Sequence, residues 1–337
     1  MRKLLVLLLS VLLVVSFVAF DYSATISAPG IPEDFTVGFA VSAIQDSWKT
    51  TEVNSILDEA ARRDYKVIMT DAQNNTEKQI ADCEDLIAQK VDMLFVAPVT
   101  TVGFDGVYEK AREAGIPVIQ IDRETEDTTW GVDYITTVVS NHYKSGYDNG
   151  IWVGENTKER DKVRVVEITG TPGGSDAQKR EQGFADAIAQ YDNIEIVALQ
   201  TGNYSRSDAQ SVMQNIIQSL APDGFDVVYT HNDTMALGTI SALKAAGITI
   251  GVPALESGEG ALVVTVDGQV EAVQAMIDGD INYIVACSAD YTFLWDIVEK
   301  YYAGEQLEEI TYTPDYYFTQ DTVATEGMQH AYDYTGE

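Results

Sequence analysis

The sequence predicts an α/β protein of two lobes, each built on a parallel β-sheet. Eight short apolar runs alternate with longer segments in which apolar residues recur every three or four positions, as in helices that cover a sheet. The chain has 337 residues and is 45% hydrophobic, which is enough for about two domains. A single hydrophobic core stops growing at about 250 to 300 residues, so two lobes are favoured over one sheet.

The first twenty residues have the pattern of a secretory signal peptide, which we assign to residues 1–20. Arg2 and Lys3 precede an apolar run from Leu4 to Phe20, and the first acidic residue is Asp21. We expect cleavage near residue 20 and a mature protein that works outside the cytoplasm. An uncleaved membrane anchor is the alternative, because no clear small-residue cleavage motif follows the run.

The apolar runs after this leader are expected to be strands. They are continuous rather than alternating, which is typical of strands buried on both faces of a parallel sheet. The predicted strands are 35–41, 66–70, 93–99, 116–121, 163–168, 194–199, 226–230 and 261–266. The predicted helices between them include 51–62, 77–89, 107–114, 176–190 and 209–220.

The predicted strands fall into two sets, separated by residues 122–162. We interpret the extended run 135–140 as the crossing between the lobes and expect a helix over 143–154. An apolar segment ends at 286–288, and the helical pattern over 291–302 indicates that the chain crosses back. The expected first lobe is 35–138 with 288–314, and the expected second lobe is 139–287 with 315–337.

Polar side chains follow the ends of four predicted strands. They are Asp71, Gln73 and Asn74; Asp122 and Arg123; His231, Asn232 and Asp233; and Asp267 with Gly268. Ligands bind at the carboxyl ends of strands in open parallel sheets, and carboxylate, amide and guanidinium groups recognise hydroxyls. The alternative is that Asp and Asn only cap helices there, a preference that Arg123 does not share.

Two loops are also expected at the ligand cleft. Trp48 follows the first strand, where its flat ring either covers a sugar ring or packs in the core or hinge. Lys49 beside it either binds a hydroxyl or is solvated. The loop TGTPGGSD (169–176) lacks the Lys-Ser/Thr of a phosphate-binding loop, so we expect a tight turn that lines the cleft.

Composition and missing motifs exclude several classes of function. The formal net charge of −32 repels nucleic-acid backbones and anionic lipid surfaces, so no nucleic-acid partner is expected. The two cysteines allow at most one disulfide, and the three histidines are too scattered to suggest a metal site. No common hydrolase, metalloprotease or phosphate-binding motif occurs. We expect no enzyme, no metal and no cofactor.

Seven stretches, taken in order, resemble the ribose and galactose type of periplasmic sugar-binding protein of ABC importers, most closely the galactofuranose-binding branch. They are VGF with SWKT, DAQNN with KQI, APV with TTVGFD, AGIPVIQIDR, GTPGGSDAQKREQGF, HNDTMALG and VDG. The resemblance implies the type I fold, in which two Rossmann-like lobes with parallel sheets are joined by a hinge of several crossovers.

The resemblance also implies the ligand-binding residues, which are Trp48, Lys49, Asp122, Arg123, Arg180, Asn232, Asp267 and, at the hinge, Cys287. Trp48 would stack on the sugar, and Lys49 stands where the branch usually has arginine. Ala40, Val41 and Gln45 replace commonly polar or acidic positions, and lysine cannot make the bidentate contact of arginine. We therefore expect one wall of the cleft to have fewer hydrogen-bonding groups.

The implied function is capture of a monosaccharide by hinge closure in the periplasm. The ligand would be a pentose or hexose, with galactofuranose as a candidate, and the loaded protein, expected to be a monomer, would dock on an ABC permease with a cytoplasmic ATPase. One alternative is a ligand-delivering partner of a chemoreceptor. Another is a secreted carbohydrate-processing enzyme, which no motif supports.

Overall fold

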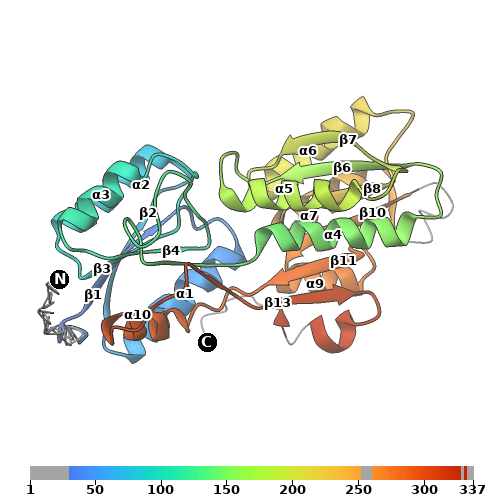
Figure 1. Ribbon diagram of the computed structural model, residues 1–337. Coiled ribbons are helices and arrows are strands. Elements are labelled where there is room, and N and C mark those ends of the chain that lie inside the picture. Colours follow the sequence, from blue (N-terminus) through green and yellow to red (C-terminus); the bar gives the residue numbers. More distant parts are fainter. Residues whose placement is uncertain (1–29, 252–259, 328–329, 332–337) are drawn as a thin grey trace, which may run out of the picture.

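The computed structural model describes residues 30–251, 260–327 and 330–331, which form two α/β lobes (Figure 1). The signal peptide assigned to residues 1–20 lies outside the described residues. Among the residues described, no helix is both long enough and apolar enough to cross a membrane. The predicted fold class is confirmed.

The first lobe contains a six-stranded sheet in the order β12-β5-β4-β3-β1-β2, and all neighbouring strands are parallel. Its strands are β1 (Thr36–Val41), β2 (Lys66–Asp71), β3 (Met93–Val96), β4 (Val118–Ile121), β5 (Thr136–Val139) and β12 (Ile310–Tyr312). Its helices are α1 (Ser47–Arg62), α2 (Thr76–Ala88), α3 (Asp105–Glu113) and α10 (Leu294–Tyr302).

The second lobe contains a seven-stranded sheet in the order β13-β11-β10-β8-β6-β7, with β9 also paired to β10. Only β13 is antiparallel to its neighbour. The strands are β6 (Val163–Thr169), β7 (Ile194–Thr201), β8 (Val227–Thr230), β9 (Thr249–Ile250), β10 (Gly260–Asp267), β11 (Tyr283–Cys287) and β13 (Asp315–Thr319). The helices are α4 (His142–Thr157), α5 (Ser175–Ile188), α6 (Arg206–Ser219), α7 (Asp233–Ala245), α9 (Val270–Ile277) and the π-helix η1 (Val323–Gly327).

Helices cover both faces of each sheet. In the first lobe, α1 and α10 pack on one face, while α2 and α3 pack on the other around Leu86 and Tyr108. In the second lobe, α6, α7 and α9 cover one face, and α4 and α5 cover the other. Each sheet therefore has its own two-sided core, and the carboxyl ends of its strands remain available for a ligand.

Three segments connect the lobes. The chain passes from β5 to α4, returns from β11 to α10, and crosses again between β12 and β13. Ser140 Oγ lies 2.8 Å from Thr313 Oγ1, and the Ser288 amide donates to the Pro314 carbonyl over 3.3 Å. Hydrogen bonds therefore join the three crossings into one hinge.

The predicted crossing over 135–140 is wrong for its central residues. Residues 136–139 form β5, which pairs in parallel with β4 and β12. All four of these side chains are buried. Buried backbone groups need hydrogen-bond partners, and the two neighbouring strands supply them. The crossing is therefore confined to Ser140 and Asn141, directly before α4 begins.

The expectation that every strand is buried on both faces fails for β2 and β7. Ile68 and Met69 on β2 are exposed, as is Leu199 on β7. Each of these strands lies at one edge of its sheet, so the helical layers cover it less completely than they cover the central strands.

Candidate functional site

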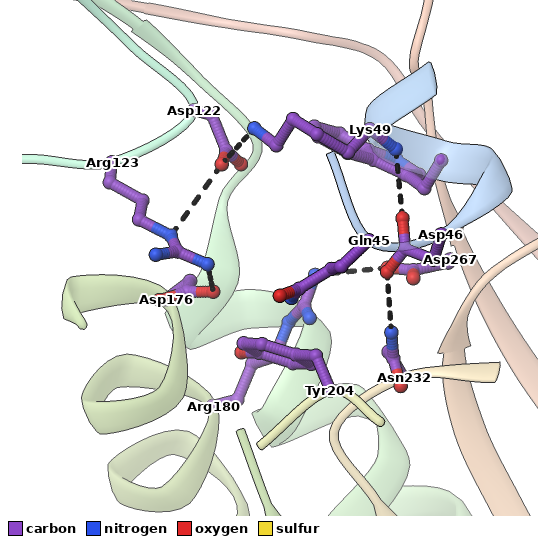
Figure 2. Close-up of a pocket in the computed structure, with 11 residues that line it drawn as sticks. Gln45, Asp46, Lys49, Asp122, Arg123, Asp176, Arg180, Tyr204, Asn232 and Asp267 are labelled. Atoms are coloured by element: carbon purple, nitrogen blue, oxygen red, sulfur yellow. Dashed lines mark hydrogen bonds and ion pairs between the residues drawn. The ribbon is translucent and has the colours of Figure 1, made fainter. Parts of the chain in front are cut away.

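A narrow pocket lies between the lobes, at the ends of the central strands (Figure 2). The lining residues are Gln45, Asp46, Trp48, Lys49, Asp122, Arg123, Asp176, Arg180, Tyr204, Asn232 and Asp267. Both lobes contribute charged side chains to the same cavity.

Seven of the eight predicted ligand-binding residues line this pocket. Cys287 does not, because it lies behind two that do. Its Sγ is 3.9 Å from Arg180 Nη2, and its carbonyl oxygen accepts a hydrogen bond from Trp48 Nε1 over 3.0 Å. Cys83 is buried in the other lobe, so the two thiols do not form a disulfide with each other.

Trp48 lies beside both the pocket and the hinge. It lines the pocket, and its indole N–H is tied to the backbone of β11 beside the hinge. Its ring makes an edge contact with Tyr291, with centroids 6.2 Å apart, and Lys49 Nζ lies 5.0 Å from the ring centroid. The indole is therefore held in one orientation by a hydrogen bond and by packing.

Lys49 is buried, so the alternative that it is solvated is wrong. Its Nζ donates to Asp122 Oδ2 over 2.6 Å and to Glu52 Oε2 over 2.7 Å. Burial alone would lower the pKa of Lys49, but the two carboxylates outweigh burial and raise it. Burial raises the pKa of Glu52 to about 7 despite the adjacent ammonium. The cluster fixes Lys49 as a cation beside the pocket.

Arg123 links the two lobes across the pocket. Its Nη2 lies 3.2 Å from Asp176 Oδ2 on α5, and its Nε lies 3.6 Å from Asp122 Oδ2. Its guanidinium also lies 5.7 Å from the centroid of the Tyr204 ring. Burial would raise the pKa of Asp176, but the charge of Arg123 holds it well below its ordinary value. These contacts explain why an arginine follows the strand, which a helix-capping role does not explain.

Arg180 and Asp267 form the corresponding pair in the second lobe. Arg180 Nη1 donates to the His231 carbonyl over 2.6 Å, and Nη2 lies 3.3 Å from Asp267 Oδ1. Burial raises the pKa of Asp267 well above its ordinary value, although the adjacent guanidinium lowers it. Each cation of the pocket thus lies beside a carboxylate, an arrangement that suits an uncharged ligand with many hydroxyls.

Asn232 caps a helix and also faces the other lobe. Its Oδ1 accepts the Met235 amide at the start of α7 over 3.0 Å, and its Nδ2 donates to Asp46 Oδ2 over 3.2 Å. Asp46 in turn caps α1 through the Lys49 amide, 2.9 Å away. Asn232 and Asp46 therefore cap helices and also line the pocket, so the two roles are compatible.

The lobes also touch beside the pocket. The Thr101 amide donates to the Gly173 carbonyl over 2.9 Å, and the Glu124 amide donates to Ser175 Oγ over 2.9 Å. Lys179 forms an ion pair with the Glu124 carboxylate. We call these three interactions the rim contacts, because they join the lobes without using any residue that lines the pocket.

The expectation that polar residues after strand ends line the ligand site includes some residues that lie elsewhere and omits others that line the pocket. Asp71, Gln73, Asn74, His231, Asp233 and Gly268 do not line the pocket. Asp46, Asp176 and Tyr204 do line it, and sequence reasoning did not select them as ligand-binding residues. Asp176 ends the quoted loop TGTPGGSD, which does reach the cleft as expected, and Tyr204 follows β7. The position after a strand was the available signal for both.

Three residues were expected to leave one wall of the cleft with fewer hydrogen-bonding groups, and only one of them lies at the pocket. Ala40 and Val41 are buried in the cores on the two faces of the first sheet, because they lie within β1 rather than after it. Gln45 does line the pocket, and its Oε1 accepts a hydrogen bond from Asn74 Nδ2 over 2.6 Å. In the described part of the chain, no cluster of three or more His, Cys, Asp or Glu side chains is arranged to hold a metal ion.

A buried glutamate and histidine lie behind the pocket in the second lobe. His231 Nε2 is 2.9 Å from Glu167 Oε1, and His231 Nδ1 accepts the Gly170 amide over 3.3 Å, which leaves the ring proton on Nε2. Burial raises the pKa of Glu167 to about 8 and lowers that of His231 to about 3. Glu167 is therefore protonated in the folded protein at pH values where the unfolded chain has released that proton.

We expect the free energy of unfolding to fall less with rising pH in Glu167→Gln than in the unmodified protein. Between the ordinary glutamate pKa and about 8, the folded state holds more protons at Glu167 than the unfolded state, so the free energy of unfolding falls with rising pH. Melting temperatures measured from pH 5 to 8 should show the variant gaining on the unmodified protein. The surface variant Glu195→Gln serves as control, and a constant offset for Glu167→Gln would contradict the assignment.

Comparisons with known proteins agree with this architecture. Residues 37–291 match the periplasmic binding protein domain family. The chain is 33% identical over 319 residues to the galactofuranose-binding protein YtfQ of Escherichia coli (strain K12), covering 94% of this chain and 96% of that protein. It is 32% identical over 260 residues to the ribose import binding protein RbsB of Bacillus subtilis (strain 168), covering 77% of this chain and 78% of that one.

A solved structure is similar over most of the chain. It is the periplasmic binding protein component of the arabinose ABC transporter from Shewanella sp. ANA-3, bound to α- and β-L-arabinofuranose. It matches with a TM-score of 0.80 and 32% identity, covering 88% of this chain and 95% of that one. The resemblance predicted from the sequence is confirmed. The chain therefore belongs to the periplasmic binding protein domain family and shares the type I fold of its sugar-binding members.

Proposed function

We propose that this protein captures a neutral monosaccharide between its lobes and delivers it unchanged to an ABC permease with a cytoplasmic ATPase. The observation that carries the proposal is the set of cation–carboxylate pairs that meet in one pocket, in which each lobe supplies charged partners. Such groups donate to and accept from hydroxyls, while their near balance of charge gives no advantage to an ionised ligand.

A furanose form of a pentose or hexose is the ligand we favour. The relatives named above include proteins described as binding galactofuranose and arabinofuranose. We assign stacking on the sugar ring to Trp48 and hydroxyl contacts to Lys49, Asp122, Arg123, Arg180, Asn232 and Asp267. Cys287 would act from behind, through its contacts with Trp48 and Arg180.

Closure about the hinge is the working motion in this proposal. We take the lobes as 35–138 with 288–314 and 139–287 with 315–337, since the chain changes sheets near these boundaries. A sugar that contacts both lobes favours the closed arrangement by its differential affinity. We further propose export by a cleaved signal peptide, a periplasmic location, a monomeric state and no catalytic activity.

The test is a thermal-shift panel of galactofuranose, ribose, galactose and arabinose. A ligand at 100 times its dissociation constant stabilises a protein by about 2.7 kcal/mol, so the true ligand should raise the melting temperature by several degrees. NMR of the recovered sugar should show no chemical change. No shift with any sugar would contradict sugar binding, and a converted sugar would support the enzyme alternative.

A further inference from the structure

The backbone of Asp122 has an uncommon, left-handed conformation. Its φ is +63°, in the left-handed region that residues other than glycine rarely adopt. The Arg123 amide donates to the Ile121 carbonyl over 2.6 Å, which closes a three-residue turn with Asp122 at its centre. This turn aims both the Asp122 and Arg123 side chains at the pocket, so its conformation has to be held by neighbouring groups.

His142 is the neighbouring side chain that holds this turn. Its Nε2 lies 2.7 Å from the Asp122 carbonyl oxygen, in a fully buried contact. A carbonyl only accepts, so the ring proton is on Nε2 and the imidazole donates it. Burial lowers the pKa of His142 to about 4, which keeps the ring neutral at ordinary pH. His142 Nε2 is also 4.0 Å from Asp122 Oδ1.

His142 stands at an unusual place in the chain. It is the first residue of α4, the helix that begins the second lobe directly after the crossing at Ser140 and Asn141 (Figure 1). A second-lobe helix therefore begins with a side chain bonded to a first-lobe turn. Its backbone amide also bonds to the Ser140 carbonyl, 2.8 Å away. The contact between His142 and Asp122 therefore spans the hinge.

The same turn of α4 also seats Arg180 of the second lobe. A Cβ atom on Gly146 would lie 2.1 Å from the Arg180 carbonyl oxygen, so α5 approaches this closely only because residue 146 is glycine. On the facing helix, a Cβ on Gly183 would lie 2.0 Å from the Tyr143 carbonyl oxygen. One turn of helix thus contacts the backbones of Asp122 and Arg180, which face the pocket from opposite lobes.

From these contacts we propose that His142 is a positioning residue for the sugar site. It holds the turn at Asp122 from across the hinge and thereby aims Asp122 and Arg123 at the ligand. The proposal rests on the proposed function for its ligand, but the hydrogen bond that it invokes joins protein to protein. It can therefore be tested both with and without a sugar.

The experiment compares His142→Gln with His142→Met. These side chains have similar length, and only glutamine can place an N–H donor near the position of Nε2. With the panel sugar that gives the largest thermal shift as probe, we expect the methionine variant to bind at least 10-fold more weakly. The glutamine variant should bind within about 3-fold of the unmodified protein. Thr157→Val, which removes a buried hydroxyl from the far end of the same helix, should leave binding unchanged.

A second measurement needs no sugar. Hydrogen exchange of a peptide covering residues 118–126 should be faster in the methionine variant than in the unmodified protein and restored in the glutamine variant. This result decides whether His142 holds the turn even if every panel sugar fails to bind, an outcome that would count against the proposed function alone.

Two results would overturn the proposal. One is a methionine variant with unmodified affinity and exchange, and the other is a glutamine variant that is as impaired as the methionine variant. If the methionine variant does not fold, the glutamine variant decides the question by itself, since a loss greater than 10-fold with the N–H donor present contradicts a role for that donor.

Discussion

Asp122→Ala is expected to weaken sugar binding by about 10- to 150-fold. The variant loses a carboxylate that lines the pocket and that lies 2.6 Å from Lys49 Nζ. A hydrogen bond to a charged group contributes about 1.5 to 3 kcal/mol, which corresponds to that change in the dissociation constant. The variant also leaves Lys49 with Glu52 as its remaining carboxylate in the cluster.

Isothermal titration calorimetry with the best panel sugar measures this effect. The matched control is Asp71→Ala, because Asp71 also ends a strand of the first sheet but does not line the pocket. We expect the control to bind within about 2-fold of the unmodified protein. Equal losses for the two variants, or no loss for Asp122→Ala, would show that this pocket is not the sugar site.

Arg180→Met is expected to abolish measurable binding and to cause the larger loss of fold stability. The substitution leaves the Asp267 carboxylate buried without the guanidinium beside it and removes a donor from the His231 carbonyl. Breaking a buried ion pair by removing one partner costs about 3 to 5 kcal/mol. Methionine fills much of the same volume, so the loss reports mainly the missing charge and hydrogen bonds.

The pH dependence distinguishes this electrostatic cause from a packing defect. Burial already raises the pKa of Asp267, and removing Arg180 removes a charge that lowers it. A raised carboxyl pKa in the folded state makes stability fall as the pH rises above the ordinary Asp value. The free energy of unfolding, measured with urea, should therefore be reduced more at pH 8 than at pH 5. The exposed-pair variant Arg206→Met is the control, and an equal reduction at both pH values would indicate lost packing instead.

The lobes and most strands could be predicted because their signal is local. A continuous apolar run marks a central strand wherever it occurs, and helices with one buried face show a period. The same signal does not predict α7 or α9, because α7 is buried on most sides and α9 has only two turns. It also assigned 136–139 to the crossing, since a strand and an apolar connection have the same local pattern.

The site could be predicted only where chemistry and position coincide in the chain. Asp122 directly follows β4, Asn232 lies two residues after β8, and Asp267 ends β10, so their places at strand ends indicate all three. Arg180 lies on the second turn of α5, so only the family resemblance indicates it.

The ion pairs and hydrogen bonds within the site depend on how the two lobes pack against each other. The pairing of Arg123 with Asp176 and the bond from His142 to Asp122 both join segments that the hinge brings together. No local pattern encodes those distances.

The rim contacts have a consequence for how quickly a cargo escapes. Thr101, Glu124 and Lys179 bond protein to protein across the lobes. In the proposed hinge motion, opening would have to break these bonds whichever sugar is bound. The rate of opening would then set the same upper limit on the dissociation rate of weakly and tightly bound sugars. Lys179 is partly exposed to solvent, so high salt should weaken its ion pair with Glu124. The residence time of every bound sugar should then shorten by the same factor.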